Sequence, residues 1–264
     1  MSENPSTTAQ DRTNLALYEK PGTVNDYTAI RVHPPEVTVL VRYREDIYGH
    51  RVLELGCGAG RLAAFLQPLA GDYIGLDFSS HMVRYCQNKY PALQFVQGDM
   101  RNLQQFGTHS FDTVIAVANL IDAVSHEDRL QVLAEAKRVL KPEGLFVFSA
   151  HNRNCTEGVG GPILRLTLNP VSQMRAVYDY LISLANHRRI KPQQRNETDY
   201  ALLNDRAHNN SVLHYYTTRG TQEKQLEAAG FRCIECLNHS GDTLAPGADD
   251  SDCASMYFVA RPIG

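Results

Sequence analysis

The sequence predicts an α/β protein built on a doubly wound, mostly parallel sheet. Three observations support this prediction. Short β-branched or leucine-rich runs alternate with helical patterns between residues 51 and 152, as in successive βαβ units. The run FDTVIAVANL at 111–120 is apolar along nearly its whole length, as expected of a strand with both faces buried. The first run, RVLEL at 51–55, leads directly into a glycine-rich turn, where ligands commonly meet such sheets.

The predicted elements follow one another along the chain. Residues 1–14 are polar and are expected to be disordered, and a short helical stretch follows at 15–21. The pair Pro34-Pro35 breaks any helix, and an amphipathic helix is expected beyond it from Val37, Leu40, Val41 and Ile47. Strands are then expected at 51–55, 73–77, 93–99, 111–120 and 145–152, and helices at 60–70, 79–90 and 126–144.

The alternation breaks after residue 152. Residues from about 155 to 213 combine a helical run at 171–189 with polar segments, and we interpret them as an insertion. The core resumes with a helix that Gly230 ends, followed by strands at 232–240 and 255–262. Cys233 and Cys236 form a C-x-x-C without a second pair or a histidine at zinc spacing, so we expect them to be strand residues.

Composition limits the class of protein. The 264 residues, 43% of them hydrophobic, suffice for one large core with a modest insertion. A formal net charge of −3 is unlike the basic footprint of a dedicated nucleic-acid binder. The chain has no apolar run of membrane-spanning length and no signal-peptide core, so we expect a cytoplasmic protein that binds neither nucleic acid nor membrane. No metal site is expected. The composition is compatible with a homodimer and does not decide the oligomeric state.

The glycine turn indicates the class of cofactor. Gly56, Gly58 and Gly60 follow G-x-G-x-G spacing rather than the G-x-G-x-x-G of dinucleotide sites, and Glu54 stands two residues before them. A carboxylate there would oppose a pyrophosphate but can accept a hydrogen bond from a cationic amine. S-adenosylmethionine carries such an amine and a sulfonium and no phosphate, so it is favoured. A nicotinamide cofactor and a turn without any ligand are the alternatives.

Acidic residues also end the next two predicted strands. Asp77 could accept from both hydroxyls of a ribose or could cap the following helix. Asp99 could accept from an adenine amino group, with the N–H of Met100 donating to the ring, or could belong to an ordinary turn. Phe78 and Met82 could pack on the adenine or on the protein core.

These residues together resemble class I S-adenosylmethionine-dependent methyltransferases. The resemblance covers roughly residues 50–150 and, more weakly, the last helix and strands. As an ordered set the motifs are specific, although each one alone is weak. The motifs are E-L-G-C-G-A-G at 54–60, L-D ending at 77, G-D-M at 98–100, FDTVIAV at 111–117 and AKRVLKPEGLFVFS at 136–149.

The resemblance implies a seven-stranded sheet whose last strand, at 255–262, is antiparallel. It implies one domain over 1–264, with a cap segment at 1–49, a cofactor-binding core at 50–152, a helical lid at 153–215 and the rest of the core at 216–264. By position, Glu54, Gly56, Cys57, Gly58 and Gly60 would meet the methionine portion, Asp77 the ribose, and Asp99 with Met100 the adenine. Ala116 would also contact the cofactor, and Tyr18, Tyr27, Arg31 and Arg44 are candidates to close over it.

Candidate acceptor-site residues follow the fourth and fifth predicted strands, where ligands reach such sheets. His151 is the best candidate for a general base, although a histidine bonded to a loop carbonyl is the alternative. Asp122 could steer a cationic acceptor or cap the next helix. Tyr215 and Tyr216 could wall the acceptor pocket or pack against the insertion. The other candidates there are Asn119, His126, Asn152, Asn154 and His214.

The function expected from these observations is transfer of a methyl group to an oxygen or nitrogen of a small molecule, with S-adenosylhomocysteine as product. The insertion would form a lid that shapes the acceptor pocket and excludes water. Its basic residues Arg188, Arg189, Lys191 and Arg195 could instead contact an anion such as RNA. A methyltransferase acting on RNA or protein, and a non-catalytic cofactor-binding protein, are therefore the alternatives.

Overall fold

The structure is a computed structural model that describes Glu19, Tyr27 and residues 31–264. The expected disorder at 1–14 and the candidate Tyr18 lie outside the described residues, as does all of the stretch at 15–21 except Glu19.

The chain is an α/β protein with a mostly parallel sheet, as the sequence predicts. Seven core strands follow the spatial order β3-β2-β1-β4-β5-β10-β9, with β10 antiparallel to both of its neighbours. The whole sheet has ten strands because the insertion adds three more. The core strands are β1 Arg51–Leu55, β2 Asp72–Asp77, β3 Gln94–Gln97, β4 Phe111–Ala116, β5 Leu140–Asn152, β9 Phe231–Leu237 and β10 Ser255–Pro262.

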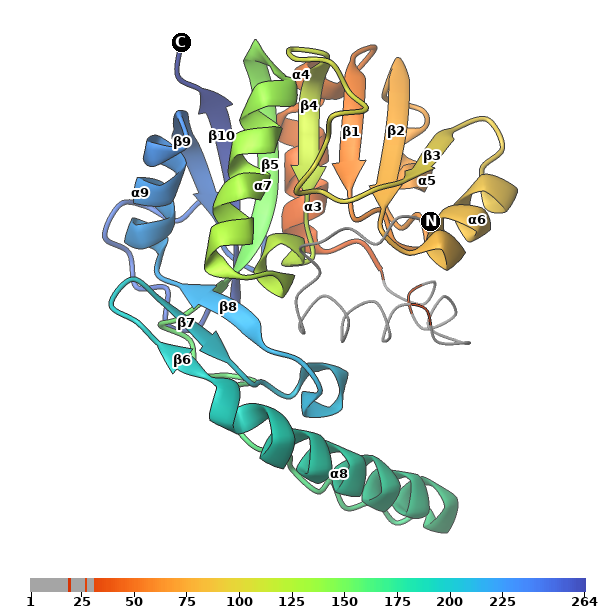
Figure 1. The fold of residues 1–264 in the computed structure, drawn as a ribbon, viewed down its shortest axis with the longest axis vertical. Helices are drawn as coiled ribbons and strands as arrows, with labels where there is room; N and C mark the ends of the chain where they lie inside the picture. The colour runs from red at the N-terminus through yellow and green to blue at the C-terminus, as the bar shows by residue number, and fades with distance from the viewer. Residues whose placement is uncertain (1–18, 20–26, 28–30) are drawn as a thin grey trace.

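Helices cover both faces of this sheet (Figure 1). One hydrophobic core packs the strands against α7 and α9, through Val132 and Leu133 of α7 and Leu226 of α9. A second core on the opposite face includes Val39 of α3 and Val83 of α6. The helices of the core are α3 Pro34–Arg42, α4 Arg44–Ile47, α5 Ala63–Leu66, α6 Ser80–Lys89, the 3-10 turn η1 Leu120–Ala123, α7 His126–Val139 and α9 Arg219–Ala228.

Several boundaries differ from those expected. Helix α7 ends at Val139 and β5 starts at the next residue, because Pro142 cannot continue a helix and Leu140 already pairs with Phe111 of β4. Helix α3 begins at Pro34 itself, since proline is well tolerated in a first helical turn. The apolar residues Val37 and Val41 of α3 are exposed, whereas Glu36 is buried because it pairs with Arg61.

The insertion is not wholly helical, because it contains strands that extend the core sheet. It comprises α8 Pro170–Ile190, η2 Lys191–Gln193, β6 Arg195–Asn196, β7 Tyr200–Leu203, η3 Ala207–Asn210 and β8 His214–Thr217. Strand β8 pairs in parallel with the carboxyl end of β5, through His151–Tyr216 and Asn152–Thr217. The sheet therefore branches at β5. Residues 146–151 of β5 pair with β10, and residues 151 and 152 pair with β8 of the insertion.

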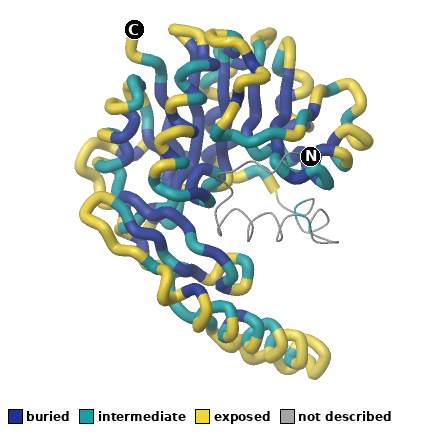
Figure 2. The backbone as a smooth tube through the Cα atoms, in the orientation of Figure 1, coloured by how far each residue is buried: buried dark blue, intermediate teal, exposed yellow. Residues whose placement is uncertain are grey.

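Helix α8 projects from the body of the protein and is mostly exposed (Figure 2). Apolar side chains are exposed on it and on the segment that leads into it, namely Ile163, Leu164, Leu166, Leu168, Val171, Met174, Val177, Tyr178 and Leu181. Within the described part of the chain, no helix combines the length and the apolar composition needed to cross a bilayer.

A buried polar cluster fixes the helices around the end of β5. Arg129 of α7 is fully buried, forms an ion pair with Asp122 of η1 and donates a hydrogen bond to Gln222 of α9. Its guanidinium also lies 4.5 Å from the centre of the Tyr215 ring of β8. One side chain thus connects α7, η1, α9 and the insertion.

We expect Arg129→Met to lower the free energy of unfolding by about 3 to 5 kcal/mol, because it leaves the Asp122 carboxylate buried without its cation. Chemical denaturation followed by circular dichroism measures this loss. Arg44→Met is the control: the Arg44–Glu45 pair is solvent-exposed, so its removal should change stability by less than about 1 kcal/mol. Equal effects of the two substitutions would contradict the role given to Arg129.

Candidate active site

A cavity of about 620 Å³ opens at the carboxyl ends of β1, β2, β4 and β5. This is the edge at which ligands bind in open α/β sheets. The glycine turn after β1 forms one part of its wall, and His151 of β5 forms another. The insertion contributes Ala207, His208 and His214. Core and insertion therefore build one continuous site.

The glycine turn has the conformation that its sequence predicts. Gly56, Gly58 and Gly60 have φ values of +61°, +53° and +74°, in the left-handed region that favours glycine. Asp77 at the end of β2 holds the turn: its Oδ2 accepts from the N–H of Gly58 at 2.8 Å, and its Oδ1 accepts from the N–H of Ser79 at 2.9 Å. Burial raises the pKa of Asp77, against the lowering effect of these two N–H groups.

Asp77 therefore positions the turn, while Ser79 caps the following helix through its hydroxyl, which accepts from the N–H of Met82. The capping role considered for Asp77 belongs to Ser79. An ionised carboxylate offers about four acceptor positions, and the backbone N–H groups of Gly58, Ser79 and Phe78 do not use all of them, so Asp77 keeps the capacity to accept from a ligand in the cavity.

Glu54 lies on β1 just before the turn and lines the cavity. Its side chain is almost fully buried, and its Oε2 accepts a hydrogen bond from the Tyr73 hydroxyl at 2.5 Å. Burial raises the pKa of Glu54 to about 7, although the Tyr73 hydrogen bond and the charge of Arg61 lower it. A cation bound beside Glu54 would stabilise the charged carboxylate.

Arg61, which sequence reasoning missed, also lines the cavity. Both of its terminal nitrogens contact the buried carboxylate of Glu36, with Nη2 donating to Oε1 at 2.8 Å. The sequence feature that could have identified Arg61 is its position directly after Gly60 of the glycine turn. Of the N-terminal candidates, Tyr27 lines the cavity, whereas Arg31 and Arg44 lie outside its wall. Arg44 instead pairs with exposed Glu45.

Four of the residues expected near an adenine line the cavity together, namely Phe78, Met82, Asp99 and Met100. The Asp99 carboxylate already binds the guanidinium of Arg101, with 2.7 Å between Oδ2 and Nη2. Ala116 is a correction: it is fully buried in the core, and the cavity wall begins one residue later, at Val117. Cys57 lines the cavity within the turn.

His151 and Asp122 form a hydrogen-bonded pair at the other end of the cavity. Asp122 Oδ2 accepts from Nδ1 of His151 at 2.9 Å and from its backbone N–H at 2.6 Å. Asp122 is fully buried and lies outside the cavity wall, so it orients His151 and does not meet an acceptor itself. The arrangement leaves Nε2 of His151 as the ring atom available to the cavity.

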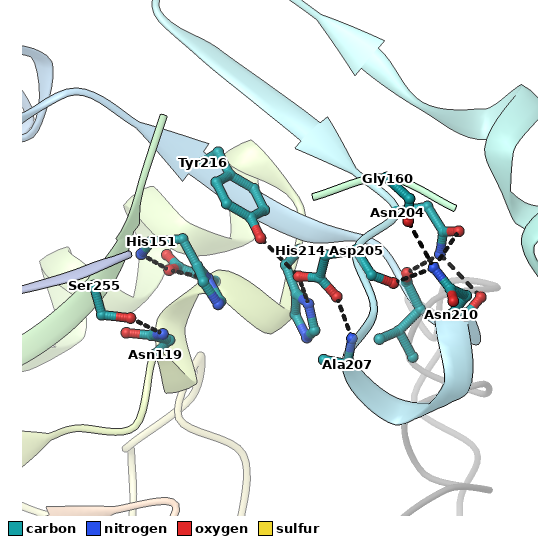
Figure 3. A network of polar contacts seen from close by, with 12 residues as sticks. Asn119, His151, Gly160, Asn204, Asp205, Ala207, Asn210, His214, Tyr216 and Ser255 are labelled. Atoms are coloured by element: carbon teal, nitrogen blue, oxygen red, sulfur yellow. Dashed lines mark hydrogen bonds and ion pairs between the residues drawn. The ribbon is translucent and has the colours of Figure 1, made fainter. Parts of the chain in front are cut away.

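Asn119 lies beside His151 in a left-handed conformation, with φ of 55°, and lines the cavity (Figure 3). Its backbone N–H donates to Ser149 Oγ and its Nδ2 donates to Ser255 Oγ, both at 2.7 Å. Its Oδ1 is buried and has no hydrogen-bond partner among the described residues.

Three expected acceptor contacts are wrong, and for Asn152 and Tyr215 the reason is that side chains alternate along strands. Asn152 follows His151 and points away from the cavity, where its Nδ2 donates to the carbonyl of Asp250. Tyr215 is fully buried, and its hydroxyl contacts Gln225 and Nδ1 of His126. Tyr216 also lies outside the cavity wall and supports it from behind: its ring stacks on His151, with centroids 4.8 Å apart.

His214 belongs to a second pair of the same kind (Figure 3). Its Nδ1 lies 2.7 Å from Asp205 Oδ2, which also accepts from the Tyr216 hydroxyl at 2.8 Å. Burial raises the pKa of Asp205, but the hydrogen bond and charge of His214 outweigh burial and lower it to about 2. Asp205 and the cavity-lining His208 were missed, because only the folded insertion brings the segment at 205–208 to the end of β5.

Comparisons with known proteins agree with this geometry. Residues 52–144 match the family model described as a methyltransferase domain. A probable phthiotriol/phenolphthiotriol dimycocerosates methyltransferase 2 from Mycobacterium ulcerans is 41% identical over 117 residues, which cover 42% of this chain and 43% of that protein. A fatty-acid O-methyltransferase from Mycolicibacterium smegmatis is 38% identical over 110 residues, covering 39% and 38%. The chain thus spans less than half the length of these curated relatives.

Solved structures extend the likeness over the whole chain. The 1,6-didemethyltoxoflavin-N1-methyltransferase of Burkholderia thailandensis, solved with 1,6-didemethyltoxoflavin and S-adenosylhomocysteine, superposes with a TM-score of 0.61. The alignment covers 100% of this chain and 94% of that one at 12% identity. At this identity the likeness is evidence of a shared fold only. The matched domain, the glycine turn and the order of the sheet lead to one conclusion. Residues 52–144 form a methyltransferase domain of the class I, Rossmann-like, S-adenosylmethionine-dependent type, and over the rest of the chain the likeness is one of fold.

Proposed function

We propose that this protein transfers a methyl group from S-adenosylmethionine to an oxygen or nitrogen of a small-molecule acceptor, releasing S-adenosylhomocysteine. One observation carries the proposal: a single cavity joins the turn held by Asp77, with Glu54 beside it, to the His151–Asp122 pair. The first end suits a cationic nucleoside, and the second suits a proton acceptor.

The chemistry of the residues at the first end fits this cofactor. Glu54 is a buried carboxylate beside the turn and would accept from the ammonium of the methionine portion. The free acceptor positions of Asp77 would take the ribose hydroxyls. A side chain at Gly58 would project into the cavity wall beside Tyr27, so glycine there keeps the space in which the cofactor would lie. Arg61 would pair with the methionine carboxylate.

At the second end the protein orients the acceptor and receives its proton. When bound, S-adenosylmethionine supplies an electrophilic methyl group whose bond to sulfur breaks, leaving the electron pair on sulfur, as the bond to the acceptor forms. Nε2 of His151 takes the proton of the reacting hydroxyl or amine. Asp122 holds the ring through Nδ1 and stabilises the imidazolium that results. The insertion closes this end and excludes water.

A small-molecule acceptor is favoured over RNA or protein because the insertion builds part of the cavity wall. The basic residues Lys191 and Arg195 line a separate hollow, which shares no lining residue with the cavity that contains His151. Lys191 and Arg195 therefore do not contact the acceptor atom that would react near His151. The relatives' names agree with this choice, since they describe methyltransferases of a fatty acid and of dimycocerosate lipids.

Asp77→Asn should weaken binding of S-adenosylhomocysteine about tenfold or more, because the new amide NH₂ faces a backbone N–H and cannot accept from the ribose. Isothermal titration calorimetry measures the affinity. Asp72→Asn, at the exposed start of the same strand, is the control and should bind as the wild type does. Unchanged affinity of Asp77→Asn would mean that the ribose lies elsewhere.

Binding of S-adenosylhomocysteine should depend on the ionisation of Glu54. The pKa of about 7 belongs to the ligand-free site, and the bound ammonium lowers it, so affinity is full above pH 7 and falls as the pH drops. We expect the dissociation constant to rise towards tenfold per pH unit between pH 7 and 5.5. Glu54→Gln should bind more weakly at pH 7.5 and should lose this dependence, whereas exposed Glu45→Gln should retain it.

The acceptor class is tested by incubating the protein with cell extract and donor labelled on its methyl group. Label should enter the small-molecule fraction. His151→Ala should lower the rate of incorporation about hundredfold, as expected for loss of a general base, and should leave affinity for S-adenosylhomocysteine unchanged. Label in RNA or protein would overturn the small-molecule assignment. Absence of any transfer by a protein that binds S-adenosylhomocysteine would indicate a non-catalytic cofactor-binding role.

A further inference from the structure

Two histidine–carboxylate pairs face the same end of the cavity. His151 of β5 pairs with Asp122 at 2.9 Å, and His214 of β8 pairs with Asp205 at 2.7 Å. Both rings line the cavity, and their centres lie 5.1 Å apart (Figure 3). Methyl transfer needs at most one general base, so the mechanism above leaves the second pair without a role.

The hydrogen bonds fix the proton on each ring. Asp205 accepts from the N–H of Ala207 and from the Tyr216 hydroxyl as well as from His214. Asp122 accepts from Arg129 and from the backbone N–H of His151. Each carboxylate therefore acts as an acceptor, and each Nδ1 carries its hydrogen. In the neutral rings both Nε2 atoms are acceptors.

The backbone around the second pair is strained, which indicates a constraint beyond packing. His208, Asn209 and Asn210 are three successive non-glycine residues with positive φ, between 49° and 55°. Non-glycine residues with such φ values are uncommon and concentrate at functional sites. Asn210 holds the turn by donating from Nδ2 to the carbonyl of Asp205 at 2.5 Å, and Asn204 donates to the carbonyl of Asn210 at 2.9 Å.

A metal ion is the first ligand to consider for this cluster. Ligand atoms of His151, Asp205 and His214 lie within 4.8 Å of one another. However, the two oxygens of Asp205 already accept from three donors, and Asp205 lies behind His214, outside the cavity wall. The carboxylate thus supports His214 and is not free to bind a metal. The Nε2 atoms of His151 and His214 remain, and in the neutral rings both are hydrogen-bond acceptors.

We propose that the methyl acceptor carries two hydroxyl groups on neighbouring carbons, one donating to Nε2 of His151 and the other to Nε2 of His214. This inference rests on the proposed function and names the class of its substrate. A hydroxyl donates one hydrogen only, so an acceptor that bonds both rings through hydroxyls needs two of them, and those of a vicinal diol lie close enough together for rings 5.1 Å apart.

The reaction then discriminates between the two oxygens. The hydroxyl on His151 gives its proton to Nε2 as its oxygen bonds to the methyl carbon, and the hydroxyl on His214 stays protonated and fixes the orientation. A molecule with one hydroxyl would leave Nε2 of His214 buried without a donor, and sites of this kind reject such analogues strongly.

Sodium periodate cleaves vicinal diols and so tests the proposal without knowledge of the acceptor. The small-molecule fraction of the extract is treated with periodate, quenched, and incubated with the protein and labelled donor. Extract that receives periodate quenched beforehand is the control. We expect incorporation to fall at least tenfold after active periodate and to be normal in the control.

The other outcomes separate this inference from the proposed function. No label in the control extract would overturn both. Label that survives active periodate would overturn the diol and leave the methyltransferase activity standing. Loss of incorporation from control extract on addition of EDTA would overturn the hydrogen-bonding role of the histidines in favour of a metal site.

His214→Asn tests the residue directly. The asparagine amide can replace Nδ1 as the donor to Asp205 but has no counterpart of Nε2. We expect the KM for the labelled acceptor to rise about tenfold, with a smaller change in kcat and unchanged affinity for S-adenosylhomocysteine. His126→Asn is the matched control, because His126 also bonds a buried partner through Nδ1 but lies outside the cavity wall. An unchanged KM in His214→Asn would overturn the assignment.

Discussion

The ion pair between Asp122 and Arg129 is sealed from solvent, and both the packing of the protein and the geometry of its site depend on it. Removing two charges from water is costly, and close pairing together with further hydrogen bonds offsets that cost. Here one carboxylate oxygen of Asp122 forms the ion pair with Arg129, and the other accepts a hydrogen bond from His151. Arg129 also donates a hydrogen bond to Gln222, and its guanidinium lies over the ring of Tyr215. The orientation of His151 is therefore coupled to the packing of α7, α9 and the insertion.

The insertion is part of the sheet and is not a flap attached to it. The parallel pairing of β8 with the end of β5 sets His151 directly beside Tyr216. Since side chains on one strand repeat every second residue, His214 faces the same side as Tyr216. The register thereby aligns His151, Tyr216 and His214 on one face, with Asp205 behind them. Main-chain hydrogen bonds thus fix the distance between the two histidines.

The sequence predicted the parts of the site that depend on neighbours along the chain. The glycine turn, Glu54 before it and Asp77 at the end of the next strand could be read because a strand, a tight turn and a strand end each have a local signature. The seven core strands and the antiparallel direction of the last one followed from the family resemblance. His151 was identified for its position at the end of β5, and the structure places it in the cavity wall.

What could not be predicted depends on contacts between distant segments or on a single step along a strand. Asn152 and Tyr215 were assigned to the cavity, but each lies one residue from the side chain that faces it. Nothing in the sequence fixes which residue of a strand end points inward. The pairing of Asp205 with His214 requires the strained turn of η3, and the pairing of β8 with β5 spans more than sixty residues of chain.

The branching of the sheet at β5 also bears on how such enzymes diversify. A loop on the surface of a fold can be exchanged with little regard for the strands beneath it. This insertion ends in a strand that is hydrogen-bonded to the last two residues of β5. A replacement for the insertion would pair with β5 only if it kept strand β8 and its register. If the proposed function holds, a change of acceptor would therefore come more readily from substitutions on this fixed frame, at positions such as 208 and 214, than from exchange of the whole segment.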